Sequence, residues 1–177
     1  MRLAIGVTMV GSTRNRNLIG PARSALALLA FVAVCATAAL VGSAFTEPSI
    51  PEWYGSLVKP SFTPPSWLFG PIWSVLYLAM ATAGWLIWLR HRNIAVALPL
   101  ALFGGQLVLN ALWSILFFGL QAPGIALVEI LTLWAMIFAT LLSFWKISTI
   151  AGWLFVPYLA WVSFATILNF EIWRLNS

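Results

Sequence analysis

Five apolar blocks, each about as long as a membrane is thick, dominate this sequence of 177 residues. An α-helix needs about 20 predominantly apolar residues to cross the hydrocarbon core of a bilayer. The blocks cover about residues 24–45, 67–89, 94–120, 123–145 and 150–173. A membrane β-barrel would alternate polar and apolar residues along each strand, and these blocks do not. The sequence therefore predicts an all-α fold, an integral membrane bundle of five transmembrane helices.

The composition excludes several classes of site. Only 7% of the residues are charged, whereas soluble domains carry about a quarter. The single cysteine, Cys35, excludes an internal disulfide and a CxxC site, and one histidine with four acidic residues predicts no metal cluster. The basic residues are scattered between apolar blocks, which indicates membrane orientation rather than nucleic-acid binding. We expect no obligate cofactor, no metal and no nucleic-acid partner.

Short connections follow the second, third and fourth blocks, so consecutive helices are expected to be antiparallel neighbours. The transmembrane domain is expected over residues 24–176, preceded by a mobile tail over residues 1–23. Seven Lys and Arg residues fall in the tail, the second loop and the fourth loop, and two fall on the other side. This asymmetry predicts a bacterial cell membrane protein with a cytoplasmic N-terminus and an outer first loop.

The third block carries two opposed ridges at helical spacing. Ala97, Ala101 and Gly105 recur every four positions on one ridge, a pattern that lets helix backbones approach closely in lipid. These residues are expected either to form a homodimer interface or to pack inside the bundle. The opposite ridge carries Gln106 and Asn110, and an amide in hydrocarbon needs a partner, so both are expected to face the interior.

Four predicted helices present a stripe that mixes flat aromatic rings with a few hydrogen-bonding groups. Such stripes either pack as a core or line a pocket for a large, flat, mostly apolar ligand. Glu129 either lines this pocket or reaches to the membrane interface. The stripes consist of Trp73, Tyr77, Met80 and Gly84; Gln106, Asn110, Trp113 and Phe117; Glu129, Thr132, Met136 and Thr140; and Tyr158, Trp161, Ala165 and Asn169.

The longest connection, about residues 46–66, contains the proline-rich stretch KPSFTPP. Proline fixes φ and lacks an N–H group, so this stretch cannot form a regular helix or a central strand. With Trp53, Tyr54, Phe62 and Trp67 it is too apolar to extend into water. We expect it to fold over the open end of the bundle as a lid, with an ordinary turn as the alternative.

Three stretches resemble the TspO/MBR family, the translocator proteins or tryptophan-rich sensory proteins. They are PEWYGSLVKPSFTPPSWLFGPIWSVLY, QLVLNALWSILFFGL and VPYLAWVSFATILNFEIWRLN. The resemblance covers about residues 25–176 and implies a membrane protein, often dimeric, that binds porphyrins such as protoporphyrin IX and haem. It implies pocket positions at Trp53, Tyr54, Pro64, Trp73, Asn110, Glu129, Trp161 and Ala165. Ile115 stands where the family often has a proline, so a kink of the third helix is not implied.

Three functions are compatible with these patterns. The first is a membrane receptor or sensor that binds porphyrins and regulates tetrapyrrole or stress responses. The second is a light-driven, porphyrin-degrading enzyme in which Trp73 and Trp161 are the candidate catalytic residues, since the sequence shows no nucleophile–base pair. The third is a transporter of porphyrin or sterol, although we find no internal repeat of the kind that transporters show. We rank them in this order.

Overall fold

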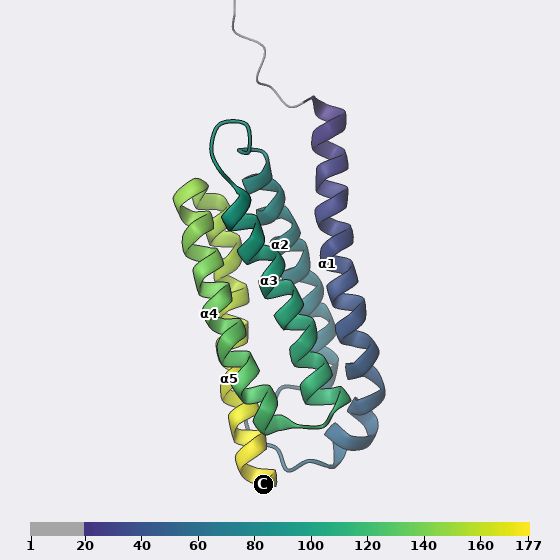
Figure 1. Cartoon of the computed structure of the whole chain (residues 1–177). Helices are drawn as coiled ribbons and strands as arrows, with labels where there is room; N and C mark the ends of the chain where they lie inside the picture. The colour runs from purple at the N-terminus through teal and green to yellow at the C-terminus, as the bar shows by residue number, and fades with distance from the viewer. Residues whose placement is uncertain (1–19) are drawn as a thin grey trace, which may run out of the picture.

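The structure is a computed structural model that describes residues 20–177 (Figure 1). Its long helices are α1 (Pro21–Ser49), α2 (Phe69–Trp88), α3 (Ala97–Ser114), α4 (Pro123–Ile147) and α5 (Thr149–Asn176). Each is long and apolar enough, with its flanking turns, to cross a membrane. No strand occurs among residues 20–177. The prediction of an all-α bundle with five spans is confirmed.

The first helix is longer than predicted at both ends. α1 begins at Pro21, a residue that suits a first turn because its missing N–H would have no partner there. It passes through Pro48 to Ser49 and continues as a π-helical turn, Ile50–Tyr54. The first loop is therefore shorter than expected, because Trp53 and Tyr54 belong to this turn. Of the tail predicted over residues 1–23, residues 1–19 lie outside the described range.

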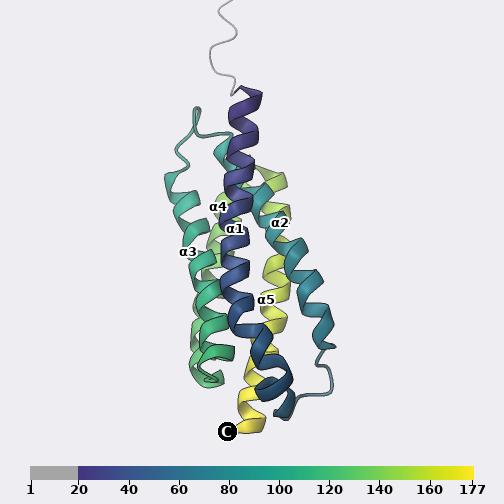
Figure 2. The same ribbon diagram turned by 90° about the vertical axis from the view of Figure 1, so that its right-hand side faces the viewer.

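The helices form a ring in the order α1, α2, α5, α4, α3. Consecutive helices are neighbours in three of four cases. For α3–α4 and α4–α5 this confirms the prediction from the short connections, whereas α1 and α2 are joined by the long first loop. The prediction is wrong for α2 and α3, which meet only sparsely because α1 packs against both and lies between them (Figure 2). Their connection, residues 89–96, is long enough to let α3 continue on the far side of α1.

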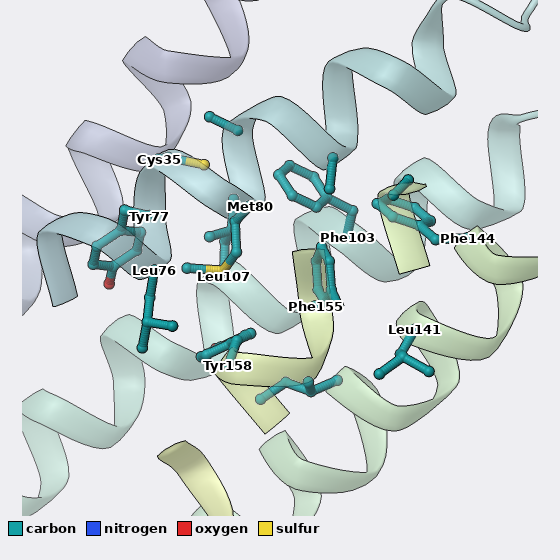
Figure 3. Packing of buried hydrophobic residues seen from close by; sticks show 14 of the residues in the cluster. Cys35, Leu76, Tyr77, Met80, Phe103, Leu107, Leu141, Phe144, Phe155 and Tyr158 are labelled. Atoms are coloured by element: carbon teal, nitrogen blue, oxygen red, sulfur yellow. The ribbon is translucent and has the colours of Figure 1, made fainter. Parts of the chain in front are cut away.

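Most of the core side chains come from α2 to α5, and α1 adds Cys35 (Figure 3). Three rings form its centre: the centroids of Phe103 and Phe144 are 6.0 Å apart, and those of Phe144 and Phe155 are 5.2 Å apart. In contrast, α1 buries only Cys35 and Gly42. Most of its apolar surface faces outward, so α1 is the least embedded helix of the bundle.

α1 is attached to the bundle at two levels. Towards its N-terminal end, the indole N–H of Trp85 donates to the carbonyl oxygen of Ser24 (3.1 Å). Towards the first loop, the hydroxyl of Ser49 donates to the carbonyl oxygen of Phe118 (2.9 Å). Between these levels the α1 residues that face α2 and α3 are mostly small, which leaves room for the cavity described below.

The end of α3 widens into a π-helical turn, Ile115–Gly119. The amide of Leu120 closes it by donating to the carbonyl oxygen of Ile115 (2.7 Å). This turn directs Phe117 and Phe118 into the interior, where both are buried. The local change in helix shape is therefore present without the proline that the family often has there.

The proline-rich loop, residues 57–65, is irregular as predicted and runs along the end of the bundle beside the C-terminus of α5 (Figure 1). The side-chain amide of Asn176 holds it. Asn176 Oδ1 accepts from the amide of Val58 (3.0 Å), and Asn176 Nδ2 donates to the carbonyl oxygen of Val58 (2.9 Å). The ring of Phe62 also meets Phe164 of α5 edge to face, with centroids 6.3 Å apart.

Replacing Asn176 with alanine is expected to release this loop. Hydrogen exchange at residues 56–63 should accelerate by about tenfold, because local opening no longer has to break two side-chain bonds. The free energy of global unfolding should change by less than about 1 kcal/mol, since these bonds are exposed. Asn93→Ala, in the exposed loop at the other end, is the control. Unchanged exchange in Asn176→Ala would show that the prolines alone fix the loop.

Candidate functional site

A cavity of about 710 Å³ lies between α1, α2 and α3, in the half of the bundle nearest the first loop. Its aromatic walls include Trp73 and Tyr77 of α2 and Trp113 of α3. α1 contributes mainly small residues. Ligand sites usually enclose about 300–1,000 Å³ and combine apolar walls with a few polar groups. The cavity therefore suits a large, mostly apolar ligand.

The mouth of the cavity lies between α1 and α2. The exposed residues along its edge come from these helices and from the turn that precedes α2. On one side of the mouth Leu40 is 69% exposed, and on the other Trp67 is 72% exposed. Since Leu40 and Leu78 of the edge are apolar and belong to spans, this part of the mouth faces the bilayer.

A chain of buried hydrogen bonds forms the inner wall. The hydroxyl of Tyr77 donates to Asn110 Oδ1 (2.6 Å), and Asn110 Nδ2 donates to the hydroxyl of Tyr158 (3.0 Å). Tyr158 in turn donates to Gln106 Oε1 (3.0 Å). Gln106 is 0% exposed and Asn110 is 4% exposed, which confirms that both amides face the interior. The chain joins α2, α3 and α5 and fixes the position of the Asn110 amide at the cavity.

A second set of contacts orients Trp113. Its indole N–H donates to Asn169 Oδ1 (3.0 Å), and Asn169 Nδ2 donates to the carbonyl oxygen of Pro123 (2.8 Å). The Trp113 ring also stacks on Phe117, with centroids 5.1 Å apart and planes 23° apart. The indole is therefore held in one orientation at the wall, with its polar edge turned towards α5.

The structure brings together part of the predicted ligand-binding set. The residues that line the cavity are Tyr54, Trp73, Tyr77, Asn110 and Trp113. A further group stands behind this wall and contacts it through hydrogen bonds or ring stacking: Gln106, Phe117, Tyr158 and Asn169. The remaining predicted residues do not border the cavity: Trp53, Pro64, Glu129, Trp161 and Ala165.

Trp161 borders a different surface. It lines an apolar groove of about 620 Å³ between α2 and α5, together with Pro71, Pro157 and Phe164. Trp73 of α2 thus borders the cavity, whereas Trp161 of α5 borders the groove. Phe69 belongs to both regions, because it lines the cavity and its ring meets that of Trp161 edge to face, with centroids 6.0 Å apart.

Glu129 is buried within the bundle, with 8% of its surface exposed. It does not reach out to the membrane interface, which was one of the two alternatives. Neither of its carboxyl oxygens has a hydrogen-bond partner among the described residues. The lack of hydrogen-bond partners distinguishes Glu129 from Asn110, although both are buried polar groups in spanning helices.

The small-residue ridge of α3 faces outward over most of its length. Ala97 and Ala101 are exposed, and Gly105 is half-buried. At Gly105 the nearest side chain is Met136 of α4, 3.7 Å from the position that a Cβ would take. Part of the ridge is therefore available for a contact outside the bundle, and part packs against α4.

The sequence prediction missed the contribution of α1. Cys35, Gly42, Ser43, Thr46 and Glu47 line the cavity, and none of them had been assigned to the site. α1 has no apolar face that stands out from the rest of the helix, so its orientation does not follow from periodicity. The signal that could have identified these residues is their spacing. Small and weakly polar side chains recur every three or four positions along α1, between larger apolar side chains.

The family model of the TspO/MBR family matches residues 31–174. The chain is 42% identical over 158 residues to the tryptophan-rich protein TspO of Chlorobaculum tepidum, covering 85% of this chain and 96% of that protein. It is 41% identical over 138 residues to the translocator protein of Homo sapiens (77% and 82%), and 40% identical over 149 residues to the tryptophan-rich sensory protein of Cereibacter sphaeroides (84% and 90%).

Proposed function

This chain belongs to the TspO/MBR family of multi-pass membrane proteins, and on that premise we propose that it binds porphyrins in the cavity between α1, α2 and α3. The family supports a role as a membrane receptor or sensor. In the proposal, a porphyrin such as protoporphyrin IX or haem is the ligand to which this receptor responds. Regulation of tetrapyrrole or stress responses would be the outcome.

One observation carries this proposal: flat indole rings and a fixed amide border the same cavity. The Trp73 ring lies 5.6 Å from that of Tyr77 and 6.0 Å from that of Tyr158, between centroids. These contacts fix the Trp73 ring at the wall of the cavity. A macrocycle in the cavity could therefore stack on the indole. Asn110 supplies a hydrogen-bonding group whose position the buried chain of bonds fixes.

Replacing Trp73 with alanine is expected to weaken protoporphyrin IX binding about tenfold or more, because a buried aromatic contact contributes about 1.5–3 kcal/mol. The measurement is quenching of tryptophan fluorescence when the purified protein is titrated in the dark. Trp153→Ala is the control, because it also removes one indole but from an exposed position on α5. Equal binding by the two variants would contradict the proposed site.

Light-driven degradation of porphyrin is a second candidate, and the placement of Trp73 supports it. An indole in contact with an excited macrocycle can be oxidised, and the rings of Tyr77 and Tyr158 stand next to it. Since Trp161 lies outside the cavity, this candidate relies on Trp73. Illumination of the titrated sample tests it: bleaching that requires the protein and is lost in Trp73→Phe would identify an enzyme.

We also propose an orientation and an oligomeric state. Arg23, Arg90, Arg92 and Lys146 occur at one end of the bundle, and the positive-inside rule assigns that end to the cytoplasm of a bacterial cell. The first loop then lies outside. The exposed part of the α3 ridge, Ala97 and Ala101, is the proposed contact between two copies of the chain.

A further inference from the structure

Charge is distributed unevenly along the bundle. All four acidic residues of the chain lie in the half nearest the first loop (Figure 1): Glu47, Glu52, Glu129 and Glu171. The opposite end, where α1 begins, carries four exposed basic side chains: Arg23, Arg90, Arg92 and Lys146. The single ion pair among residues 20–177 joins Arg174 to Glu171, near the first loop. Within the described part of the chain, the cations of the opposite end therefore have no carboxylate as a counter-charge.

The connection between α2 and α3 holds two of these arginines in fixed positions. The backbone amides of His91 and Asn93 donate to the carbonyl oxygens of Trp88 (3.0 Å) and Arg90 (2.9 Å). The His91 ring stacks on that of Trp88, with centroids 4.7 Å apart, and its Nδ1–H donates to the Trp88 carbonyl oxygen at 2.6 Å. These contacts fix the turn against the end of α2. The residues on either side of His91, Arg90 and Arg92, are exposed.

α1 brings a third arginine to the same region. The carbonyl oxygen of Ser24, the residue that follows Arg23, accepts from the indole N–H of Trp85 on α2 (3.1 Å). Arg90 follows Trp85 by five residues, a little more than one helical turn further towards this end. The connection of residues 89–96 then leads to α3, on the far side of α1 (Figure 2). The arginines of α1 and of the connection therefore lie at the same end of the seam between α1 and α2.

Tryptophans mark the depth of this end in the membrane. Indole rings gather at the interface between hydrocarbon and water, at the level of the lipid headgroups. The last turns of α2 and α4 and the first turns of α5 carry four of them: Trp85, Trp88, Trp145 and Trp153. The rings of Trp145 and Trp153 also contact each other, with centroids 4.8 Å apart. The arginines stand just beyond this level, where they meet lipid phosphates rather than acyl chains.

The chemistry of these arginines fits a phosphate. A guanidinium group presents a planar fork of donors that binds two phosphate oxygens at once, and it keeps its charge at any physiological pH. The first turn of α1 adds backbone N–H groups that no side chain caps. A zwitterionic headgroup would place its own cation beside these groups, whereas an anionic headgroup supplies the negative charge that this end lacks.

We propose that Arg23, Arg90 and Arg92 bind the phosphate of an anionic phospholipid, and that this lipid holds the N-terminal end of α1 against α2. α1 is the least embedded helix, so a ligand that bridges it to the connection between α2 and α3 would stabilise the bundle where its own contacts are fewest. This site is at the opposite end from the mouth of the cavity. The inference requires neither a porphyrin ligand nor a particular orientation in the membrane.

The test compares phosphatidylglycerol with phosphatidylcholine of the same acyl chains, each added to the protein in a neutral detergent. Phosphatidylglycerol should raise the temperature of thermal unfolding by about 5 °C, because a ligand that binds only the folded state stabilises it. It should also slow hydrogen exchange at residues 24–30 by about tenfold, since these turns of α1 would open less often. Phosphatidylcholine should do neither. The variant Arg23→Gln/Arg90→Gln/Arg92→Gln should lose both effects of phosphatidylglycerol.

Lys146→Gln is the matched control. It removes an exposed cation at the same end, but from α4, which is not a neighbour of α1 in the ring, so both effects should persist. Without lipid, both variants should unfold at the wild-type temperature, because neither loses an ion pair. An undiminished response of the triple variant, or an equal loss in Lys146→Gln, would overturn the site. Equal protection by phosphatidylcholine would overturn the preference for an anionic headgroup, and equal protection by inorganic phosphate would overturn the assignment to a lipid.

Discussion

Replacing Asn110 with leucine is expected to lower the free energy of unfolding by about 2–4 kcal/mol and to weaken ligand binding about tenfold or more. Leucine keeps the approximate volume of asparagine but has no hydrogen-bonding group. The hydroxyl of Tyr77 would lose its acceptor, and the hydroxyl of Tyr158 would lose a donor, both in the buried wall. A polar group left alone in the interior loses its bond to water without replacement.

Unfolding in mixed detergent micelles measures the loss of stability, and Tyr77→Phe provides the control. Alone, Tyr77→Phe should cost about 1 kcal/mol, because it removes the donor and leaves Asn110 with its bond to Tyr158. Combined with Asn110→Leu, it should restore part of the lost stability, since the unpaired hydroxyl is gone. Strictly additive losses would show that the chain of bonds does not act as a unit.

The second large effect is expected at the tight connection between α4 and α5. A Cβ at Gly152 would lie 2.7 Å from Cε3 of Trp145 and 3.0 Å from its Cα. A ring can rotate away, but the Cα belongs to the backbone of α4, so a side chain at position 152 must separate the two helices. Gly152→Val should reduce the free energy of unfolding by about 3 kcal/mol or more, and Gly152→Ala by about 1–3 kcal/mol.

Gly104→Ala is the matched control for the two substitutions at Gly152. A Cβ at Gly104 meets no atom within 4 Å, so the added methyl group has room. Alanine also favours the helix over glycine by about 1 kcal/mol, so this variant should be as stable as wild type or more stable. Thermal unfolding in detergent separates the cases. Wild-type stability in Gly152→Ala would mean that α4 and α5 can move apart without loss.

The sequence alone predicts the membrane spans, because helices of a soluble fold do not contain apolar segments as long as these. It also predicts the interior position of Gln106 and Asn110, since an amide cannot remain unpaired in hydrocarbon. It does not predict which helices surround the cavity. The ring order depends on how α1 passes between α2 and α3, and a loop of moderate length allows several paths.

The helical wheel also has limited angular resolution. Tyr158 and Trp161 lie about 60° apart on α5, close enough to be assigned to one stripe. In the structure this small angle separates the buried centre, where Tyr158 is 0% exposed, from the groove between α2 and α5 that Trp161 borders. Burial of Glu129 could not be predicted either, because a carboxylate near a helix end can also turn towards water.

The contact between Asn176 and Val58 affects how this protein should be tagged. A fusion partner or label attached next to Asn176 would crowd the side chain that holds the first loop. The same loop leads into Ser66 and Trp67 at the edge of the cavity. A bulky label at this position would thus alter the entrance whose ligand it is meant to report, whereas a flexible spacer between Asn176 and the label would leave the loop in place.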